Sequence, residues 1–208
     1  MEIIDISRSI RPSTATWPGD LAFSADWTAR CTEGSSVNLS AIHLSSHTAT
    51  HADAPLHVEN GAASIDQLPL SAFIGPATVI EVPEGVSMIQ PAHVQSHADD
   101  LNERVLFKTE ASRIPDSQWP DGFAAFAPGT IDWLAERSVK LIGTDAPSVD
   151  PVDSTELPVH HALRSLGVVN LEGLQFRNVS PGTYRLVALP LKIIDLEASP
   201  VRAVLLRD

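Results

Sequence analysis

The segment from His47 to His57 constrains the structure of this chain more than any other stretch. It reads His-Thr-Ala-Thr-His-Ala-Asp-Ala-Pro-Leu-His, so eleven residues hold three histidines and one carboxylate. A fully extended strand would separate His47 from Asp53 by roughly 20 Å. A helix would align His47 with His51 but would point Asp53 away from both. We therefore expect the chain to turn near residues 50–53.

The side chains of this segment suit a metal centre. His47, His51 and Asp53 offer two imidazoles and a carboxylate, which are ligands that zinc and manganese accept. No cysteine is nearby, so we expect a catalytic site rather than a structural zinc site, which usually includes thiolates. Pro55 keeps the following chain out of a helix, and the position of His57 predicts a proton carrier beside the metal. The alternative is a polar surface loop with unrelated histidines.

Further ligands are expected in the C-terminal third of the chain. His160 and His161 lie in an expected helix, 157–166, where adjacent side chains point about 100° apart, so one of the two can face a site. Glu172 follows an expected apolar strand, 168–171, and a carboxylate there is costly if it is buried without a cation. The alternatives are an exposed helix surface for the histidine pair and a solvated strand end for Glu172.

Two other features have competing interpretations. His93 and His97 lie four residues apart on an expected helix, 88–98, but no carboxylate is placed beside them, so we assign them to the surface. Trp17 lies in the expected loop Trp17-Pro18-Gly19-Asp20, because proline and glycine mark turns. An aromatic ring in a loop is either a plug over the core or a wall for a flat substrate.

The remaining pattern predicts one α/β domain that spans residues 1–208. Alternating apolar residues predict a hairpin from 23–29 and 36–45. Apolar runs predict a buried strand at 139–143, followed by a loop, 144–148, at the strand end where open α/β sheets tend to place ligands. Other strands are expected at 2–9, 77–82, 104–109, 184–189 and 201–206, and a helix at 131–136 with Thr130 as its N-cap.

Charge and composition exclude several classes of partner. The net charge of -12 disfavours nucleic acid and anionic membranes. No apolar run approaches the length of a membrane span, and the acidic start of the chain lacks the pattern of a signal peptide. We therefore expect a soluble cytoplasmic protein. Cys31 is the one cysteine, which excludes a disulfide within the chain.

A set of short motifs runs from the first expected strand almost to Asp208. They are His47-x3-His51-x-Asp53-Ala54-Pro55-x-His57, Gly143-Thr144-Asp145-Ala146-Pro147-Ser148, His160, Glu172-Gly173-Leu174, Trp17-Pro18-Gly19-Asp20 and Leu189-Pro190-Leu191-Lys192. Together they resemble the cyclase-like metal-dependent hydrolases. The His-Asp-His motif is specific to that superfamily, and the flanking motifs resemble its arylformamidase branch, the bacterial kynurenine formamidases.

The resemblance implies a centre of two zinc ions per subunit, with manganese as the alternative metal. It implies that His47 and His51 bind the first ion, that His160 binds the second, and that Asp53 and Glu172 bridge both. His160 is chosen over its neighbour because it falls at the position in the family that lies twelve residues before the glutamate.

The resemblance also implies the fold and the chemistry. It implies a cyclase-like, swivelling β/β/α fold with a central mixed sheet and flanking helices, and a homodimer. It implies that His57 donates and accepts the proton and that Trp17 contacts the substrate. We expect Phe126 as a second aromatic residue that packs against the substrate ring. The implied reaction is hydrolysis of N-formyl-L-kynurenine to L-kynurenine and formate in tryptophan degradation. The alternatives are a related enzyme that opens isatin or a cyclic imide, and a metal-binding protein without turnover.

Overall fold

The computed structural model describes residues 1–207. Its β-strands are β1 (Glu2–Asp5), β2 (Ser24–Ala29), β3 (Leu39–His43), β4 (His51–Asp53), β5 (Ile74–Glu81), β6 (Met88–Ile89), β7 (Arg104–Lys108), β8 (Ala125–Phe126), β9 (Leu141–Thr144), β10 (Val169–Glu172), β11 (Gly182–Val187), β12 (Ala198–Pro200) and β13 (Val204–Arg207). Its α-helices are α1 (Pro128–Ala135) and α2 (Pro158–Leu166).

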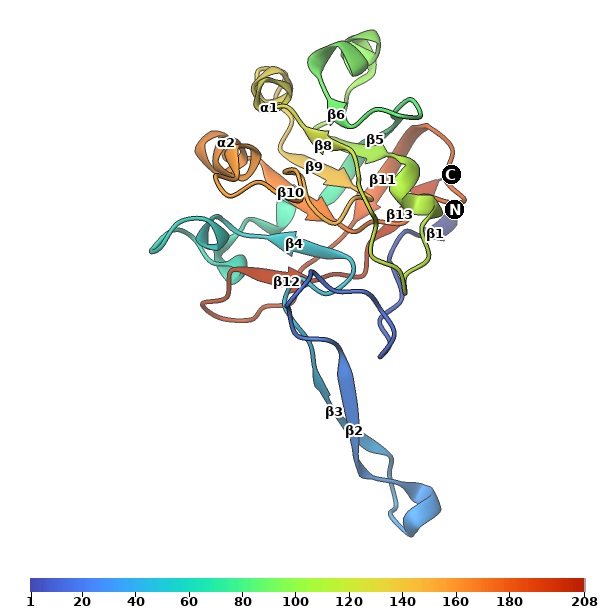
Figure 1. The fold of residues 1–208 in the computed structure, drawn as a ribbon. Coiled ribbons are helices and arrows are strands. Elements are labelled where there is room, and N and C mark those ends of the chain that lie inside the picture. Colours follow the sequence, from blue (N-terminus) through green and yellow to red (C-terminus); the bar gives the residue numbers. More distant parts are fainter. Residues whose placement is uncertain (208) are drawn as a thin grey trace.

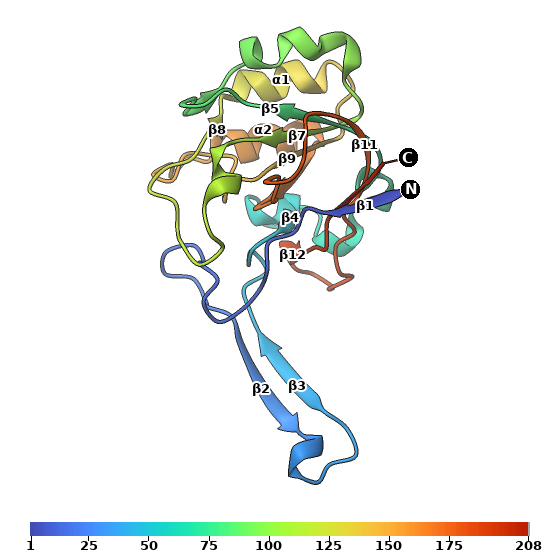
Figure 2. The same ribbon diagram turned by 90° about the vertical axis from the view of Figure 1, so that its right-hand side faces the viewer.

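A nine-stranded mixed sheet forms the body of the molecule, in the order β1-β13-β11-β5-β7-β9-β10-β4-β12. The central strands β5, β7, β9 and β10 run parallel to one another, and antiparallel strands complete both edges. The sheet curls strongly from one edge to the other (Figures 1 and 2). The expected α/β fold with a central mixed sheet is therefore confirmed.

The central strands are buried on both faces, as parallel strands usually are. In β7, Val105 and Phe107 point to the helix-covered face, where they share a core with Ile131 of α1 and Leu163 of α2. Leu106 lies between them in the sequence and joins the second core, on the other face. This alternation follows from the two-residue period of a strand, and it leaves a hydrophobic layer on each side of the sheet.

Gly143 in β9 shows how tightly the second core is packed. A Cβ atom at this position would lie 2.6 Å from Leu106 and 2.7 Å from Leu174. Both distances are shorter than carbon atoms tolerate, so only glycine lets the two leucine side chains approach the strand. The loop after β9 therefore starts from a fixed position beside β10.

A long hairpin of β2 and β3 extends away from the body (Figures 1 and 2). It carries exposed large apolar side chains, among them Trp27, Leu39 and Ile42, which are 53%, 54% and 60% exposed. The hairpin was expected from the sequence. Its projection into solvent was not, because an alternating pattern indicates an apolar face without indicating what covers it.

Two sequence-based expectations about helices are wrong. Residues 88–98 do not form a helix, because the chain there runs through β6 and then through short 3-10 turns, one of which starts at Pro91. Thr130 is not an N-cap, because α1 begins at Pro128 and the Thr130 hydroxyl donates to the carbonyl of Ile89. No helix among residues 1–207 is long and apolar enough to cross a membrane.

Candidate metal centre

The pairing of β4 with β10 brings two distant segments together. In this antiparallel ladder, His51 lies opposite Glu172 and Ala52 lies opposite Leu171. Side chains two residues apart on a strand share a face, so Asp53 joins His51 on the face that also carries Glu172. All three side chains are buried.

The turn in the histidine segment lies earlier than expected. Residues 46–50 form the turn, and His51–Asp53 are extended as β4, so the expectation of a turn near 50–53 is wrong. His51 and Asp53 can share a site from one strand, and only His47 has to fold back. Ala49 makes this possible with a left-handed φ of 59°. Its carbonyl oxygen passes so close to Gly173 that a Cβ atom at that glycine would lie only 2.2 Å from it.

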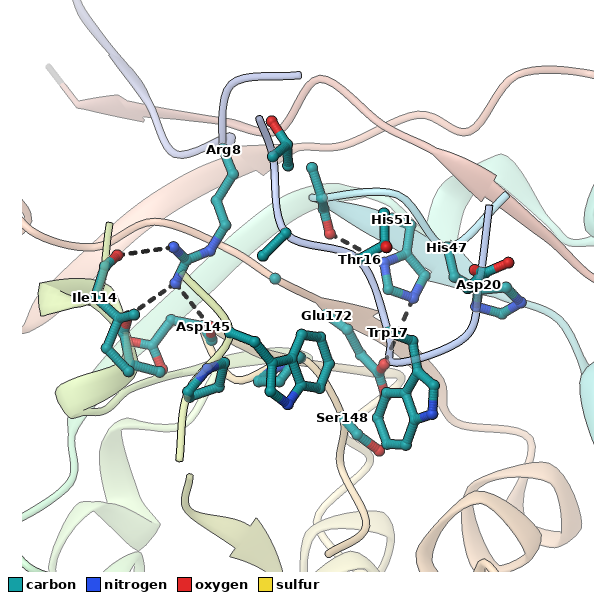
Figure 3. A pocket seen from close by; sticks show the side chains of 18 of the residues that line it. Arg8, Thr16, Trp17, Asp20, His47, His51, Ile114, Asp145, Ser148 and Glu172 are labelled. Carbon is teal, nitrogen blue, oxygen red and sulfur yellow. Dashed lines mark hydrogen bonds and ion pairs between the residues drawn. The ribbon is translucent and has the colours of Figure 1, made fainter. Parts of the chain in front are cut away.

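His51 is held in one orientation by the backbone. Its Nδ1 lies 3.1 Å from the carbonyl oxygen of Ala49, which fixes Nδ1 as the donor and leaves Nε2 without a proton when the ring is neutral. Nε2 lies 3.5 Å from Oδ1 of Asp53 and 3.5 Å from Oε2 of Glu172. The free nitrogen of His51 therefore points at two carboxylates, and Figure 3 shows it directed at Glu172.

His160 approaches the same carboxylates from α2. Its Nδ1 lies 2.7 Å from Oδ2 of Asp150, whose carboxylate also accepts the backbone N–H groups of Val159 and His160 at the start of the helix. Its Nε2 lies 3.6 Å from Oδ2 of Asp53 and 3.4 Å from Oε1 of Glu172. The adjacent His161 is exposed.

His47 and His57 line the open side of the cluster. Nδ1 of His47 lies 3.1 Å from Oδ1 of Asp53, and its Nε2 lies 3.3 Å from Oε1 of Glu197. The ring centroid of His57 is 4.4 Å from that of His47 and 5.4 Å from that of His160. The ligand atoms of His47, Asp53 and His57 lie within 4.8 Å of one another, so the geometry allows His57 either as a ligand or as a base.

The donor atoms fit a metal ion. Nε2 of His51 and Oδ1 of Asp53 are buried and have no hydrogen-bond partner among the described residues. Atoms bound to one zinc ion at about 2.1 Å in a tetrahedron lie about 3.4 Å apart. The observed spacings of 3.5 Å from His51 and of 3.4 and 3.6 Å from His160 match this value. Each carboxylate turns one oxygen to His51 and the other to His160.

The charges of the cluster favour a cation. Burial alone would lower the pKa of His51, but Asp53 and Glu172 outweigh it and raise the pKa to about 9. Burial is likewise outweighed at His160, where Asp150, Asp53 and Glu172 raise the pKa to about 12. Burying two carboxylates costs several kcal/mol each unless positive charge compensates them. Protons on the histidines supply that charge here, and a metal ion would supply more.

A cavity of about 440 Å³ opens onto the centre and is lined by His47, His51, His57, His160 and Glu172. Two tryptophans form an aromatic wall of this cavity, with the rings of Trp17 and Trp119 in edge contact at a centroid distance of 5.2 Å. Arg8 and Ile114 mark the end of the cavity away from His47 and His51 (Figure 3). An aromatic molecule can therefore lie against the tryptophans with one end at the histidines.

Comparisons with known proteins identify the family. Residues 4–151 match the cyclase family, described as putative cyclases. A kynurenine formamidase of Salinibacter ruber is 54% identical over 206 residues, which cover 99% of this chain and 97% of the relative. The chain belongs to the cyclase family. The family match ends before His160 and Glu172, so those two residues are connected to the centre by the structure.

Solved structures show the same fold for this cyclase-family chain. A potential metal-dependent hydrolase with cyclase activity is 29% identical, with a TM-score of 0.84 over 98% of this chain and 96% of the other. Isatin hydrolase A of Labrenzia aggregata superposes with a TM-score of 0.83 over 100% of this chain and 94% of the other. At 23% identity, the isatin hydrolase supports the fold alone.

Sequence reasoning missed several polar residues of the centre and misplaced one aromatic residue. Asp150, Asn170 and Glu197 each contact a candidate ligand, but each is a single polar residue without a spacing pattern. Phe126 is buried against Phe107 in the core, so the expectation that it contacts a substrate is wrong. Trp119 occupies the place next to Trp17.

Proposed function

We propose that this chain is a metal-dependent hydrolase that converts N-formyl-L-kynurenine to L-kynurenine and formate, as a kynurenine formamidase of tryptophan degradation. The observation that carries the proposal is the 54% identity, over nearly the full length of both chains, with a kynurenine formamidase. The candidate centre supports it, because an unactivated formamide is hydrolysed slowly without a polarised carbonyl and an activated water. We propose that residues 1–208 act as a single catalytic domain.

We propose a centre of two zinc ions, with manganese as the alternative metal. His47 and His51 would hold the first ion and His160 the second, with Asp53 and Glu172 bridging both. The division of carboxylate oxygens supports this assignment, because Oδ1 and Oε2 face His51 while Oδ2 and Oε1 face His160. Glu197 and Asp150 would orient His47 and His160 by accepting from the ring nitrogens that face away from the ions.

The proposed chemistry divides between the metal centre and His57. Bound metal ions in such a centre supply an activated water and a polarised carbonyl oxygen. Burial lowers the pKa of His57, so its imidazole is neutral near pH 7 and can accept a proton. His57 would take the proton of the water as the oxygen bonds to the formyl carbon. It would return that proton to the aniline nitrogen as the C–N bond breaks.

The aromatic wall supports an aryl substrate. Trp17, which is 39% exposed, and Trp119 would contact the ring of the substrate, with the formyl group at the histidines. Isatin has a similar ring without an amino-acid tail, so ring stacking alone does not choose between the two substrates. The identity with the formamidase favours the linear formamide.

A homodimer is proposed from the β2–β3 hairpin. An isolated two-stranded hairpin is marginal in water, and exposed apolar patches usually mark interaction surfaces. The exposed apolar residues of the hairpin and its base are Leu21, Trp27, Val37, Leu39 and Ile42. We propose that a second copy of the chain covers them. Separately, we propose that the protein works in the cytoplasm. Light scattering on the eluting protein should give twice the mass of one chain.

Parallel kinetics test the substrate. Metal-loaded protein should hydrolyse N-formyl-L-kynurenine with a higher kcat/KM than isatin or a cyclic imide. Formate and L-kynurenine should be released in equal amounts. A higher kcat/KM for isatin would assign the protein to the isatin-opening branch and would leave the metal centre unaffected.

A further inference from the structure

Asn170 contacts both proposed bridging carboxylates. It lies on β10, two residues before Glu172, so the two side chains share a face of the strand. Its Nδ2 donates to Oδ2 of Asp53 at 2.8 Å and to Oε1 of Glu172 at 3.1 Å. The residue is 5% exposed. One amide nitrogen therefore links a carboxylate on β4 with a carboxylate on β10.

The two oxygens that Asn170 contacts belong to one half of the centre. They are the oxygens that face Nε2 of His160, at 3.6 Å for Asp53 and 3.4 Å for Glu172. The other oxygens of the same carboxylates face His51. Asn170 therefore acts directly on the oxygens of the proposed second ion and only indirectly on those of the first.

Hydrogen-bond capacity explains why an amide suits this position. A carboxylate oxygen has two lone pairs, so the N–H group of Asn170 can occupy one lone pair of Oδ2 of Asp53 and leave the other for a cation. Oε1 of Glu172 accepts the backbone N–H of Val149 at 3.0 Å as well as Asn170, so two N–H groups orient this oxygen. Oδ2 of Asp53 has Asn170 as its hydrogen-bond donor within residues 1–207. The Asn170 amide therefore orients this oxygen of Asp53, while the other oxygen lies 3.1 Å from Nδ1 of His47.

Charge adds a second reason. Asp53 and Glu172 are both buried, and like charges at this distance repel one another. Asn170 binds to both without adding charge, so it holds the pair together when no cation does. An apolar side chain of the same size would leave the two carboxylates free to separate.

We propose that Asn170 is a positioning residue that preforms the site of the second ion by holding Oδ2 of Asp53 in place beside Glu172. The inference rests on the two-ion centre of the proposed function. Removal of the amide should weaken binding of the second ion by about 10- to 100-fold, which is the usual effect of losing a group that orients metal ligands. Binding of the first ion should change much less.

Zinc titration of metal-free protein tests the inference. Wild type, Asn170→Leu, Asn170→Asp and the control Asn102→Leu are titrated by calorimetry and by competition with a chromophoric chelator. Asn102 is a matched control because its amide also donates to a side chain, Thr78, but at a distance from the centre. Thermal unfolding of each protein, free and zinc-loaded, reports stability separately from affinity.

The expected results differ between the variants. Asn170→Leu should bind the second ion about 10- to 100-fold more weakly than wild type, and the gain in Tm on zinc loading should shrink. Metal-free Asn170→Asp should unfold at a lower temperature than metal-free Asn170→Leu, because a third carboxylate replaces the donor. Asn102→Leu should bind zinc as wild type does.

Three outcomes would overturn the inference. Wild-type zinc affinity in Asn170→Leu, with an equal fall of Tm in the free and loaded forms, would assign Asn170 a purely structural role. Equal stability of metal-free Asn170→Asp and Asn170→Leu would show that the amide does not hold the carboxylates together. Wild-type protein that binds fewer than two zinc ions would instead refute the two-ion centre itself, before any variant is considered.

Discussion

Buried carboxylates lie at two places in this molecule, a single one at Asp145 and a pair at Asp53 and Glu172, and their hydrogen-bonding needs are met differently. Asp145, in the loop after β9, accepts backbone N–H and hydroxyl donors from Thr109 and Ser112. Asp53 and Glu172 instead face histidine nitrogens, and Oδ1 of Asp53 has no hydrogen-bond partner among residues 1–207. Neutral donors complete the hydrogen bonding of Asp145, whereas Asp53 and Glu172 depend on positive charge from the histidines or from a metal ion.

The difference separates a structural carboxylate from a proposed metal ligand. Burial raises the pKa of Asp145, and the hydrogen bonds around it act against that rise. At Asp53 the effect of burial is outweighed by His51, His160 and His47, which hold the pKa well below its usual range. Asp145 and Asp53 are both buried, so burial alone does not distinguish them. Their partners do, because Asp145 holds neighbouring loops together by hydrogen bonds, whereas Asp53 faces histidines and suits a metal centre.

The strongest test of this comparison changes each aspartate to the isosteric asparagine. Asp53→Asn should reduce bound metal toward zero and turnover to background, because the variant loses a ligand charge shared by both ions. Asp145→Asn should keep its metal but lose about 1–3 kcal/mol of unfolding free energy. The –NH2 group of the new amide cannot accept the hydrogen bonds that Thr109 and Ser112 donate. Elemental analysis and denaturant unfolding measure the two effects.

The comparison would fail if these results were exchanged. Metal loss in Asp145→Asn, together with full metal content in Asp53→Asn, would show that the centre has been assigned to the wrong carboxylate. Metal-free Asp53→Asn provides an internal check. It should be less stable than metal-free wild type, because it removes the attraction between the Asp53 carboxylate and the histidines that hold its pKa low.

The next effect concerns one half of the centre. His160→Ala should bind one ion fewer and lose most of its turnover, because Nε2 of His160 faces one oxygen of each proposed bridging carboxylate. His161→Ala should keep both ions and full activity, because His161 is exposed and does not line the cavity. Paired measurements of metal content and rate that gave the opposite pattern would show a wrong ligand assignment.

His57 tests whether the histidines beside the cluster serve as ligands or as a base. We expect His57→Ala to keep its metal and to lose turnover by about 10²- to 10⁴-fold, the usual contribution of general acid–base catalysis. His57 is close enough to His47 and Asp53 to share an ion with them, so metal content is the decisive measurement. A stoichiometric loss of metal would make His57 a ligand.

The sequence predicted the centre where the information is local. His47, His51, Asp53 and His57 lie in one short segment, so their ligand chemistry is visible before the fold is known. Glu172 could be suspected because a charge ends an apolar strand. In contrast, Asn170 and Glu197 contact the cluster only through strand pairing and chain folding, which no local pattern encodes.

For the fold, the sequence likewise predicted single elements but not how they pair. Apolar runs located the central strands correctly, because parallel strands buried on both faces have continuous hydrophobic sequences. The helix expected at 88–98 was wrong because a proline inside an apolar-periodic segment permitted two interpretations, and the chain adopts a strand and 3-10 turns there. The order of nine strands in one curled sheet depends on long-range pairing, which the pattern of single elements does not specify.

The smallest expected effect lies away from these buried carboxylates, on the aromatic wall of the cavity. The ring of Trp17 meets that of Trp119 edge to face, and an aromatic contact contributes about 0.5–1.5 kcal/mol beyond its buried area. Trp17→Ala should therefore raise KM for N-formyl-L-kynurenine by about two- to tenfold, while kcat changes less. Such a pattern indicates binding that is equal in the ground and transition states.

Trp17→Phe should recover most of the affinity, and Trp133→Ala on α1 should leave KM unchanged, because Trp133 does not line the cavity. If Trp17→Ala lowered kcat and left KM as in wild type, Trp17 would be shaping the metal centre, and the separation of aromatic wall from charged cluster would have to be abandoned.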